Sequence, residues 1–231
     1  MGTFEFETNK GELFCLAAIQ GFGSLLNIEY EPEETGTDLL AVFNKLTERL
    51  RNKNWLDEDF DGNMTVDSKM VTAISLCGSA DRFWVLQSHV KRETAADYIY
   101  TLFNTGDDYL VLEQIDGEKY KGLLTSDIAA AVSAMFTRTP FTETAHAYPK
   151  IMPGEVEVIT EQESYALVSV SKYTTAAEGD ERSLVCLDAA MFLLLDNGGA
   201  YMLSVDETDD GVFVPVDKAG FDRIFLDREG D

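Results

Sequence analysis

The chain is short of basic residues. Its 231 residues include 18 Lys and Arg against 42 Asp and Glu, which gives a formal net charge of −24 at pH 7. Basic side chains release counterions from a phosphate backbone, so this balance argues against binding to nucleic acid. The acidity has two interpretations. It keeps the protein soluble through self-repulsion, or it forms a surface for a partner, including mimicry of nucleic acid.

Long apolar runs are missing too. No stretch approaches the ~20 residues of a membrane span, and the start, MGTFEFETNK, has neither the basic nor the apolar region of a signal peptide. We therefore expect no membrane insertion and a cytoplasmic location. Hydrophobic residues nevertheless make up 45% of the chain, with 14 Phe and 9 Tyr, which is enough for a folded core.

Cysteine is scarce. The chain has three, Cys15, Cys77 and Cys186, in the apolar contexts LFCLAA, ISLCGS and LVCLDA. No two of them are spaced as C-x-x-C, the spacing of many zinc and redox sites. An odd number of cysteines in such surroundings predicts buried, reduced, structural thiols.

Catalytic motifs are also absent. Neither G-x-S-x-G nor H-E-x-x-H occurs in the sequence. The two histidines, His89 and His146, leave a cysteine–histidine pair open, but His146 lies in a proline-flanked segment and all three cysteines lie in apolar ones. We therefore expect no enzymatic activity and no cofactor.

The N-terminal third predicts one strand and three helices. Residues 3–8 alternate as a strand, and Asn9 with Glu12 three residues later predicts a helix capping box. A second helix is expected from Thr37 to about residue 55. A third carries Met70, Ile74 and Cys77 on one stripe, capped by Thr65 or Asp67.

The middle of the chain predicts a run of strands. Residues 83–90, 96–104 and 107–115 are typical of strands joined by tight turns, and a helix is expected from Ser126. Further on, Val156 and Val158 suggest another strand. Thr160 with Glu163 then suggests a second cap, followed by a helix.

A weak internal repeat relates two parts of the chain. YTLFNTGDDYLVLEQIDGEKYKGLLTSDIA, from Tyr100, aligns without gaps with FLLLDNGGAYMLSVDETDDGVFVPVDKAGF, from Phe192, at an offset of 92 residues. We expect a single α+β domain over residues 1–231, with pseudo-twofold halves 1–138 and 154–231 joined by a proline-containing linker, 139–153. Its sheet should be mixed, mainly antiparallel, and flanked by helices. A chance match of two ordinary hairpins is the alternative.

The stretch DEDFDGNMTVDSKM, residues 57–70, opens like an EF-hand calcium loop. Asp57, Asp59, Asp61 and Gly62 match positions 1, 3, 5 and 6 of that loop. Position 12 should be a bidentate glutamate but is Ser68, and the chain has no second loop to pair with. We therefore predict no metal site here, but a bend joining the second and third helices. Weak calcium binding by the three aspartates remains the alternative.

A basic pair interrupts the acidic pattern. HVKRE, residues 89–93, places Lys91 and Arg92 at the tip between two predicted strands. An ordinary solvated hairpin tip is one interpretation, and a contact loop for a partner is the other.

Two stretches resemble the EspG family, cytosolic chaperones of type VII (ESX) secretion. They are ELFCLAAIQGFGSLLNIEY, from Glu12, and NKNWLDEDFDGNMTVDSKMVTAISLCGSADRFWVL, from Asn52. The resemblance covers mainly residues 4–115. It implies a pseudo-twofold α+β fold, and a role in binding the tip of a helical secretion substrate and keeping it soluble until export.

The resemblance also implies where a partner binds. The matching places are the loop from Gln87 to Thr94 and, less closely matched, the region from Ser171 to Ser183. The expected partner-binding residues in the loop are Gln87, His89, Val90, Lys91, Arg92 and Glu93.

The chain also departs from the family pattern. It is shorter than typical members, and its second half is the least family-like. The expected partner is therefore a helical protein of the WXG or LXG type rather than a PE–PPE pair. Two other functions stay open, an acidic immunity protein that neutralises a toxin and a calcium-responsive module, and the sequence does not set the oligomeric state.

Overall fold

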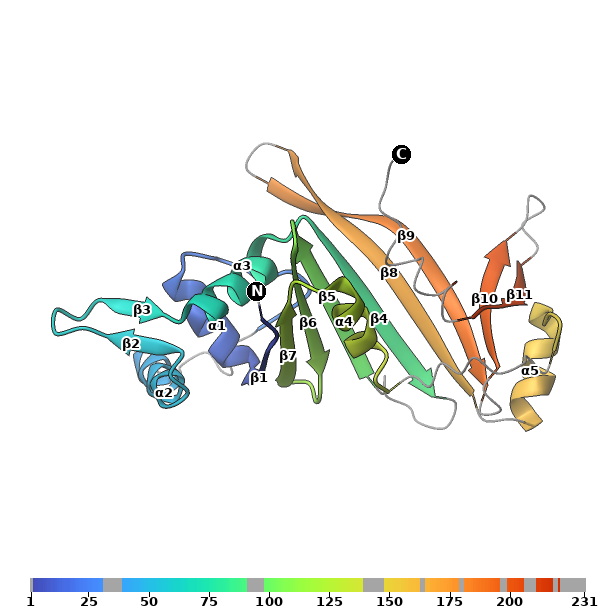
Figure 1. Cartoon of the computed structure of the whole chain (residues 1–231), viewed down its shortest axis with the longest axis horizontal. Helices are drawn as coiled ribbons and strands as arrows, with labels where there is room; N and C mark the ends of the chain where they lie inside the picture. Colours follow the sequence, from blue (N-terminus) through green and yellow to red (C-terminus); the bar gives the residue numbers. More distant parts are fainter. Residues whose placement is uncertain are drawn as a thin grey trace. The chain divides into compact units, whose positions relative to one another are not determined.

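The computed structural model describes residues 2–30, 39–90, 98–138, 148–162, 165–178, 181–195, 199–205, 211–217 and 220. Over these residues the chain is α+β, as predicted, and nine of its strands form a large antiparallel sheet (Figure 1). The elements in chain order are β1 (Phe4–Asn9), α1 (Lys10–Ile19), α2 (Leu39–Asn52), β2 (Leu56–Glu58), β3 (Met64–Val66), α3 (Ser68–Ser79), β4 (Arg82–Val90), β5 (Tyr98–Thr105), β6 (Asp108–Gln114), β7 (Lys119–Thr125), α4 (Ile128–Met135), α5 (Pro153–Gln162), β8 (Tyr165–Glu178), β9 (Glu181–Leu195), β10 (Ala200–Val205) and β11 (Gly211–Pro215).

The hydrogen-bonded strand order of the large sheet is β1-β7-β6-β5-β4-β8-β9-β10-β11, and β2 pairs with β3 in a separate hairpin. By its internal contacts the chain divides into two compact units. The first comprises residues 1–82 and 103–127, and the second comprises residues 83–102 and 128–231. Among the described residues, no helix has the length and apolar content needed to cross a bilayer.

The first unit is organised around a buried carboxylate at the start of α1. The predicted capping box is confirmed, because the Asn9 side chain accepts a hydrogen bond from the Glu12 amide at 2.9 Å and the Glu12 side chain accepts one from the Asn9 amide at 3.3 Å. Glu12 is 2% exposed. Its Oε2 also accepts hydrogen bonds from the Thr8 hydroxyl at 3.1 Å and from Lys53 Nζ at 2.7 Å. One carboxylate therefore links β1, α1 and the end of α2, and a buried charge that is paired in this way is tolerated.

A glycine in β7 lets an aromatic ring lie against the sheet. Phe6 of β1 is directly opposite Gly122 of β7 in the antiparallel ladder. A Cβ on Gly122 would overlap the Phe6 ring. Trp55 packs edge-on against the other side of this ring, with the ring centroids 5.7 Å apart. Gly122 thus provides the space in which the Phe6 ring is buried.

In the second unit, two of the predicted elements are wrong. Residues 153–162 form helix α5 instead of a strand, and residues 165–178 form strand β8 instead of a helix. Pro153 stands at the first helical position, where its missing N–H costs nothing, and Glu155 accepts a hydrogen bond from the Met152 amide at 2.9 Å. Thr160 is no cap, because its hydroxyl donates back to the Val156 carbonyl within the helix at 2.7 Å.

A hydrophobic cluster fills the space between α5 and one end of the second unit's strands. It consists of the buried side chains Ile151, Ile159, Leu193, Leu195, Tyr201 and Phe213. Ile151 also exchanges backbone hydrogen bonds with Phe213 at 2.8 and 2.9 Å. Ile151, which falls within the predicted linker, is therefore part of the core, and the half-buried Tyr148 packs against it. Residues 139–147 lie outside the described part of the chain.

The segments related by the internal repeat have similar strand pairings. β6 pairs antiparallel with β7, and β10 pairs antiparallel with both β9 and β11. Each segment is therefore an antiparallel strand–turn–strand unit, as its alternation and turn residues suggested. The division into pseudo-twofold halves at 138 and 154 stays a prediction.

Replacing Gly122 tests the packing of Phe6. We expect Gly122→Ala to lower the free energy of unfolding by about 1–3 kcal/mol, because the added methyl group must displace the buried ring. Gly117→Ala is the matched control, since a Cβ there meets no atom within 4 Å. Thermal unfolding followed by circular dichroism measures both. Equal melting temperatures for the two variants would contradict this account of the Phe6 site.

Candidate functional site

The structure describes part of the predicted partner loop. Gln87 and His89 lie near the end of β4 and are exposed, and Ser88 between them is buried. Lys91, Arg92 and Glu93 lie outside the described residues, as does the side chain of Val90. The described part therefore contributes two polar side chains that point to the same face of β4.

Two contacts between β4 and β8 show which side chains of the two strands lie on the same face of the sheet. The rings of Phe83 on β4 and Tyr173 on β8 stack with centroids 5.0 Å apart. On the other face, Lys172 Nζ lies 5.9 Å from the centroid of the Trp84 ring. Because side chains alternate along a strand, Gln87 and His89 point to the same side as Phe83, and therefore to the same side as Tyr173.

Strand β9 adds exposed apolar side chains to this face. Its register with β8 pairs Leu184 with Thr175, Cys186 with Tyr173, and Met191 with Ser169. Directly opposed residues point to one side of a sheet, so all three lie on the face of Tyr173. Leu184 is 51% exposed, Met191 is 42% exposed, and Cys186 is exposed as well. The predicted burial of the Cys186 thiol is therefore wrong.

We call these residues the docking face: Gln87, His89, Tyr173, Leu184, Cys186 and Met191. They come from β4, β8 and β9, which are adjacent in the sheet of the second unit (Figure 1). The face has apolar side chains on β9 and polar ones at the end of β4. Such a mixture is typical of protein–protein contact surfaces.

The β9 residues of this face were not identified by sequence reasoning. The run SLVCLDAAMFLLL, from Ser183, is almost continuously apolar, a pattern typical of a buried strand. Residues 192–195 are indeed buried, but residues 184–189 are exposed. Only a weak signal in the sequence could have separated the exposed residues from the buried ones, because Asp188 is the one charged residue of the run. The resemblance to the EspG family indicated residues 171–183. Of these, residues 171–178 form the end of β8 and residues 181–183 form the start of β9.

The D-x-D-x-D-G stretch forms a β-hairpin instead of the predicted simple bend between helices. β2 and β3 pair through Leu56–Glu58 and Met64–Val66. Asp59 Oδ1 accepts the amides of Asp61 and Asn63, each at 2.9 Å, and Oδ2 accepts the Asn63 side-chain amide at 2.8 Å. Gly62 has φ +81°, which favours glycine. The turn is therefore formed by Asp59, Gly62 and Asn63.

The same hydrogen bonds stabilise the ionised form of the Asp59 carboxyl group. They lower the pKa of this carboxyl below its ordinary value, with the Asn63 side chain as the largest cause. The carboxylate thus accepts its hydrogen bonds from donors within its own turn. In the described part of the chain, no group of three or more His, Cys, Asp and Glu side chains is arranged to hold a metal. Asp57, Asp59 and Asp61 are thus not brought together as a ligand set.

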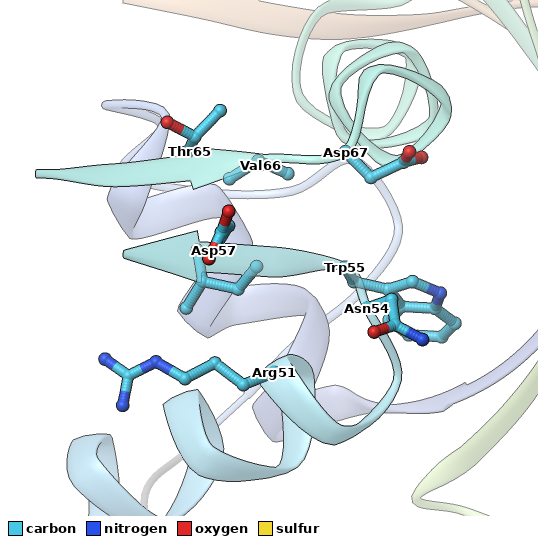
Figure 2. Close-up of a pocket in the computed structure, with 8 residues that line it drawn as sticks. Arg51, Asn54, Trp55, Asp57, Thr65, Val66 and Asp67 are labelled. Atoms are coloured by element: carbon cyan, nitrogen blue, oxygen red, sulfur yellow. The ribbon is translucent and has the colours of Figure 1, made fainter. Parts of the chain in front are cut away.

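A cleft of about 440 Å³ lies at the neck of this hairpin (Figure 2). Two of its polar side chains have partners within the protein. Arg51 pairs with Glu58, and the Asp67 carboxylate, one of the two predicted caps of α3, accepts the Lys69 and Met70 amides. The Asp67 amide donates to the Trp55 carbonyl at 3.0 Å and closes the neck. The cleft is thus a structural junction between α2, the hairpin and α3. Its lining consists of Arg51, Asn54, Trp55, Leu56, Asp57, Thr65, Val66 and Asp67.

Comparison with known proteins finds a similar fold but no matching sequence family. No protein-family model matches the sequence, and no curated protein matches it. The structure is similar to that of the Mycobacterium tuberculosis type VII secretion system chaperone EspG5, solved in complex with a PE25–PPE41 dimer, with a TM-score of 0.55 and 11% sequence identity. The similarity covers 92% of this chain and 91% of that chain. At this identity it shows a shared fold, and the expected EspG-like architecture is confirmed.

The three cysteines should differ in reactivity. Burial, followed by the nearby Glu12 charge, raises the pKa of Cys15 to about 11, and burial raises the pKa of Cys77 as well. Both thiols stay protonated at neutral pH, and a protonated thiol is a poor nucleophile. We expect one fast-reacting thiol in the native protein with a colorimetric disulfide reagent, and three in denaturant. Cys186→Ser should abolish the fast reaction; two or more fast thiols in the native protein would contradict the burial of Cys15 and Cys77.

The hairpin should not take up calcium. We expect calorimetric titration with millimolar calcium to give no saturable heat, because the Asp59 carboxylate is already hydrogen-bonded within the turn. Asp59→Ala is the comparison, and it should give the same flat titration. A saturable heat that disappears in Asp59→Ala would establish a calcium site and overturn this interpretation.

Proposed function

We propose that this protein is a non-enzymatic chaperone or adaptor of type VII secretion, which binds a helical secretion substrate and keeps it soluble before export. The observation that carries the proposal is the fold match to a chaperone of that system over nearly the full length of both chains. A match confined to one strand–turn–strand unit would carry little weight, because small α+β motifs recur in unrelated proteins.

The docking face is the surface that we assign to the substrate. Leu184 and Met191 expose apolar side chains along β9, with Cys186 between them in sequence, and Gln87 and His89 provide polar groups on the same side of the sheet. Exposed apolar side chains that gather on one face are typical of partner-binding surfaces in soluble proteins. An amphipathic helix suits such a face, because its apolar stripe would cover the β9 side chains and its flanks would reach the polar groups.

The charge of the chain bears on the kind of partner. At a net charge of −24, association with another strongly acidic protein is slowed, and association with a basic one is accelerated at low salt. Lys91 and Arg92 follow β4 in the sequence and lie outside the described residues. They would add local positive charge to this acidic chain. We propose a small helical partner of the WXG or LXG type, met in the cytoplasm before export. EspG5 itself was solved with PE25–PPE41.

A binding experiment tests the proposal. Each small helical protein encoded near this one is co-expressed with it, and the affinity of any purified complex is measured by calorimetry. We expect Met191→Glu to weaken binding by about tenfold or more, because it places a charge in the centre of an apolar contact. Val158→Glu is the matched control, since Val158 is exposed on α5 and does not belong to the docking face.

Two outcomes would contradict the proposal. One is that none of the neighbouring helical proteins binds. The other is that Met191→Glu and Val158→Glu bind equally well, which would remove the docking face from the interaction. Capture of a toxin encoded next to this protein, with inhibition of its activity, would favour the immunity role instead.

A further inference from the structure

In the described part of the chain, the N-terminal part of β9 is an open edge of the sheet. β9 is 15 residues long, but its register with β10 covers only Phe192–Leu194. Residues 181–191 pair with β8 on one side and, in the part of the chain that the structure describes, with no strand on the other. Figure 1 shows β10 beside the C-terminal end of β9 alone. The backbone N–H and C=O groups along such an edge are able to pair with a further strand.

This edge is apolar on both faces of the sheet. Val185 is opposite Thr174 and so points away from the docking face, whereas Leu184 points toward it. Val185 is 42% exposed and Leu187 is 47% exposed, and Leu187 is the extra residue of a bulge at Lys172/Tyr173. A helix would cover one face only. A strand added at the edge would lie beside the side chains of both faces and pair with the backbone groups as well.

The usual protection of an open edge is sparse here. In natural proteins, charges, prolines or bulges prevent an edge strand from pairing with another chain. Between residues 184 and 191 there is one charged residue, Asp188, and no proline. The bulge at Leu187 interrupts the β8 ladder, but the register is continuous from Glu181 to Cys186. The regular part of the edge is therefore also the part that exposes Leu184 and Val185.

We propose that this edge pairs antiparallel with the same edge of a second copy of the chain and forms a symmetric dimer. A twofold axis makes such an interface self-complementary and closed. If Val185 meets its own counterpart on the axis, Leu184 lies opposite Cys186 of the other copy. All three residues are exposed, so this register places exposed apolar side chains at the centre of the interface.

The charge of the chain sets the conditions for the dimer. Each copy carries −24, so the two copies repel each other at low salt. At physiological ionic strength charges further apart than about 8 Å are largely screened. An interface made by one strand from each copy is also small, which is typical of weak, reversible association. The dimer should therefore become more populated with rising salt and rising protein concentration.

This dimer is separate from the proposed function, although Leu184 lies in both surfaces. Sedimentation over a range of protein and salt concentrations tests it. We expect Val185→Lys to raise the dimer dissociation constant by about tenfold or more, because it places two like charges together on the axis. Val158→Lys, the same change at an exposed valine of α5, should leave the constant unchanged. A monomer under all conditions would overturn the proposal without affecting the chaperone role.

Cross-linking tests the register. Leu184→Cys places a thiol opposite Cys186 of the other copy, at a separation that a disulfide spans between directly opposed residues. Mild oxidation should convert this variant to a covalent dimer faster than wild type or Val158→Cys. Equal rates would overturn the pairing. If a segment of the same chain covers the edge, Val185→Lys would instead lower the melting temperature of a monomer, and this result would also overturn the proposal.

Discussion

The backbone ladder between β8 and β9 is the interaction on which the second unit depends. It pairs all 14 residues of β8 with β9, and a single irregularity between Lys172 and Tyr173 interrupts it. At one end the ladder holds Leu193 and Leu195 beneath α5, in the cluster with Tyr201 and Phe213. At the other end it extends past the short strand β10. The same pairing therefore buries one half of β9 and leaves the other half exposed.

Two surfaces follow from this difference in strand length, and they suit different partners. The docking face presents side chains on one side of the sheet, with Met191 and Leu184 on β9 and Gln87 and His89 on β4. The edge presents backbone groups, with Leu184 and Val185 on either side of it. A partner helix would bind the first, and a second copy of β9 would bind the second. The acidity of the chain acts on both, because it disfavours acidic partners and weakens self-association at low salt.

Local sequence signals predicted the elements whose ends are set by adjacent residues. Asn9 with Glu12 was expected as a cap of α1, and Thr65 or Asp67 as the cap of α3. Asn9 and Asp67 do cap their helices, because a side chain within one turn decides each cap. Val156 and Val158 suggested a strand because alternating valines favour one. The segment is a helix whose Ile159 and Val156 pack in or against the hydrophobic cluster, and the partners there are distant in sequence. The aspartates at 57–61 matched a calcium loop in spacing, but the Asp59 carboxylate accepts hydrogen bonds from Asn63 and Asp61 and thereby shapes a hairpin.

By itself the sequence determined the class of protein: an acidic α+β chain with capped helices, a run of antiparallel strands and no catalytic motif. Composition, period-2 alternation and capping residues act over a few positions, so they can be interpreted along the chain. Only the tertiary structure decided which part of the apolar run at 183–195 is buried. That outcome depends on how far β10 extends beside β9 and on where α5 packs. Both are contacts between residues distant in sequence, and no local pattern in the run records them.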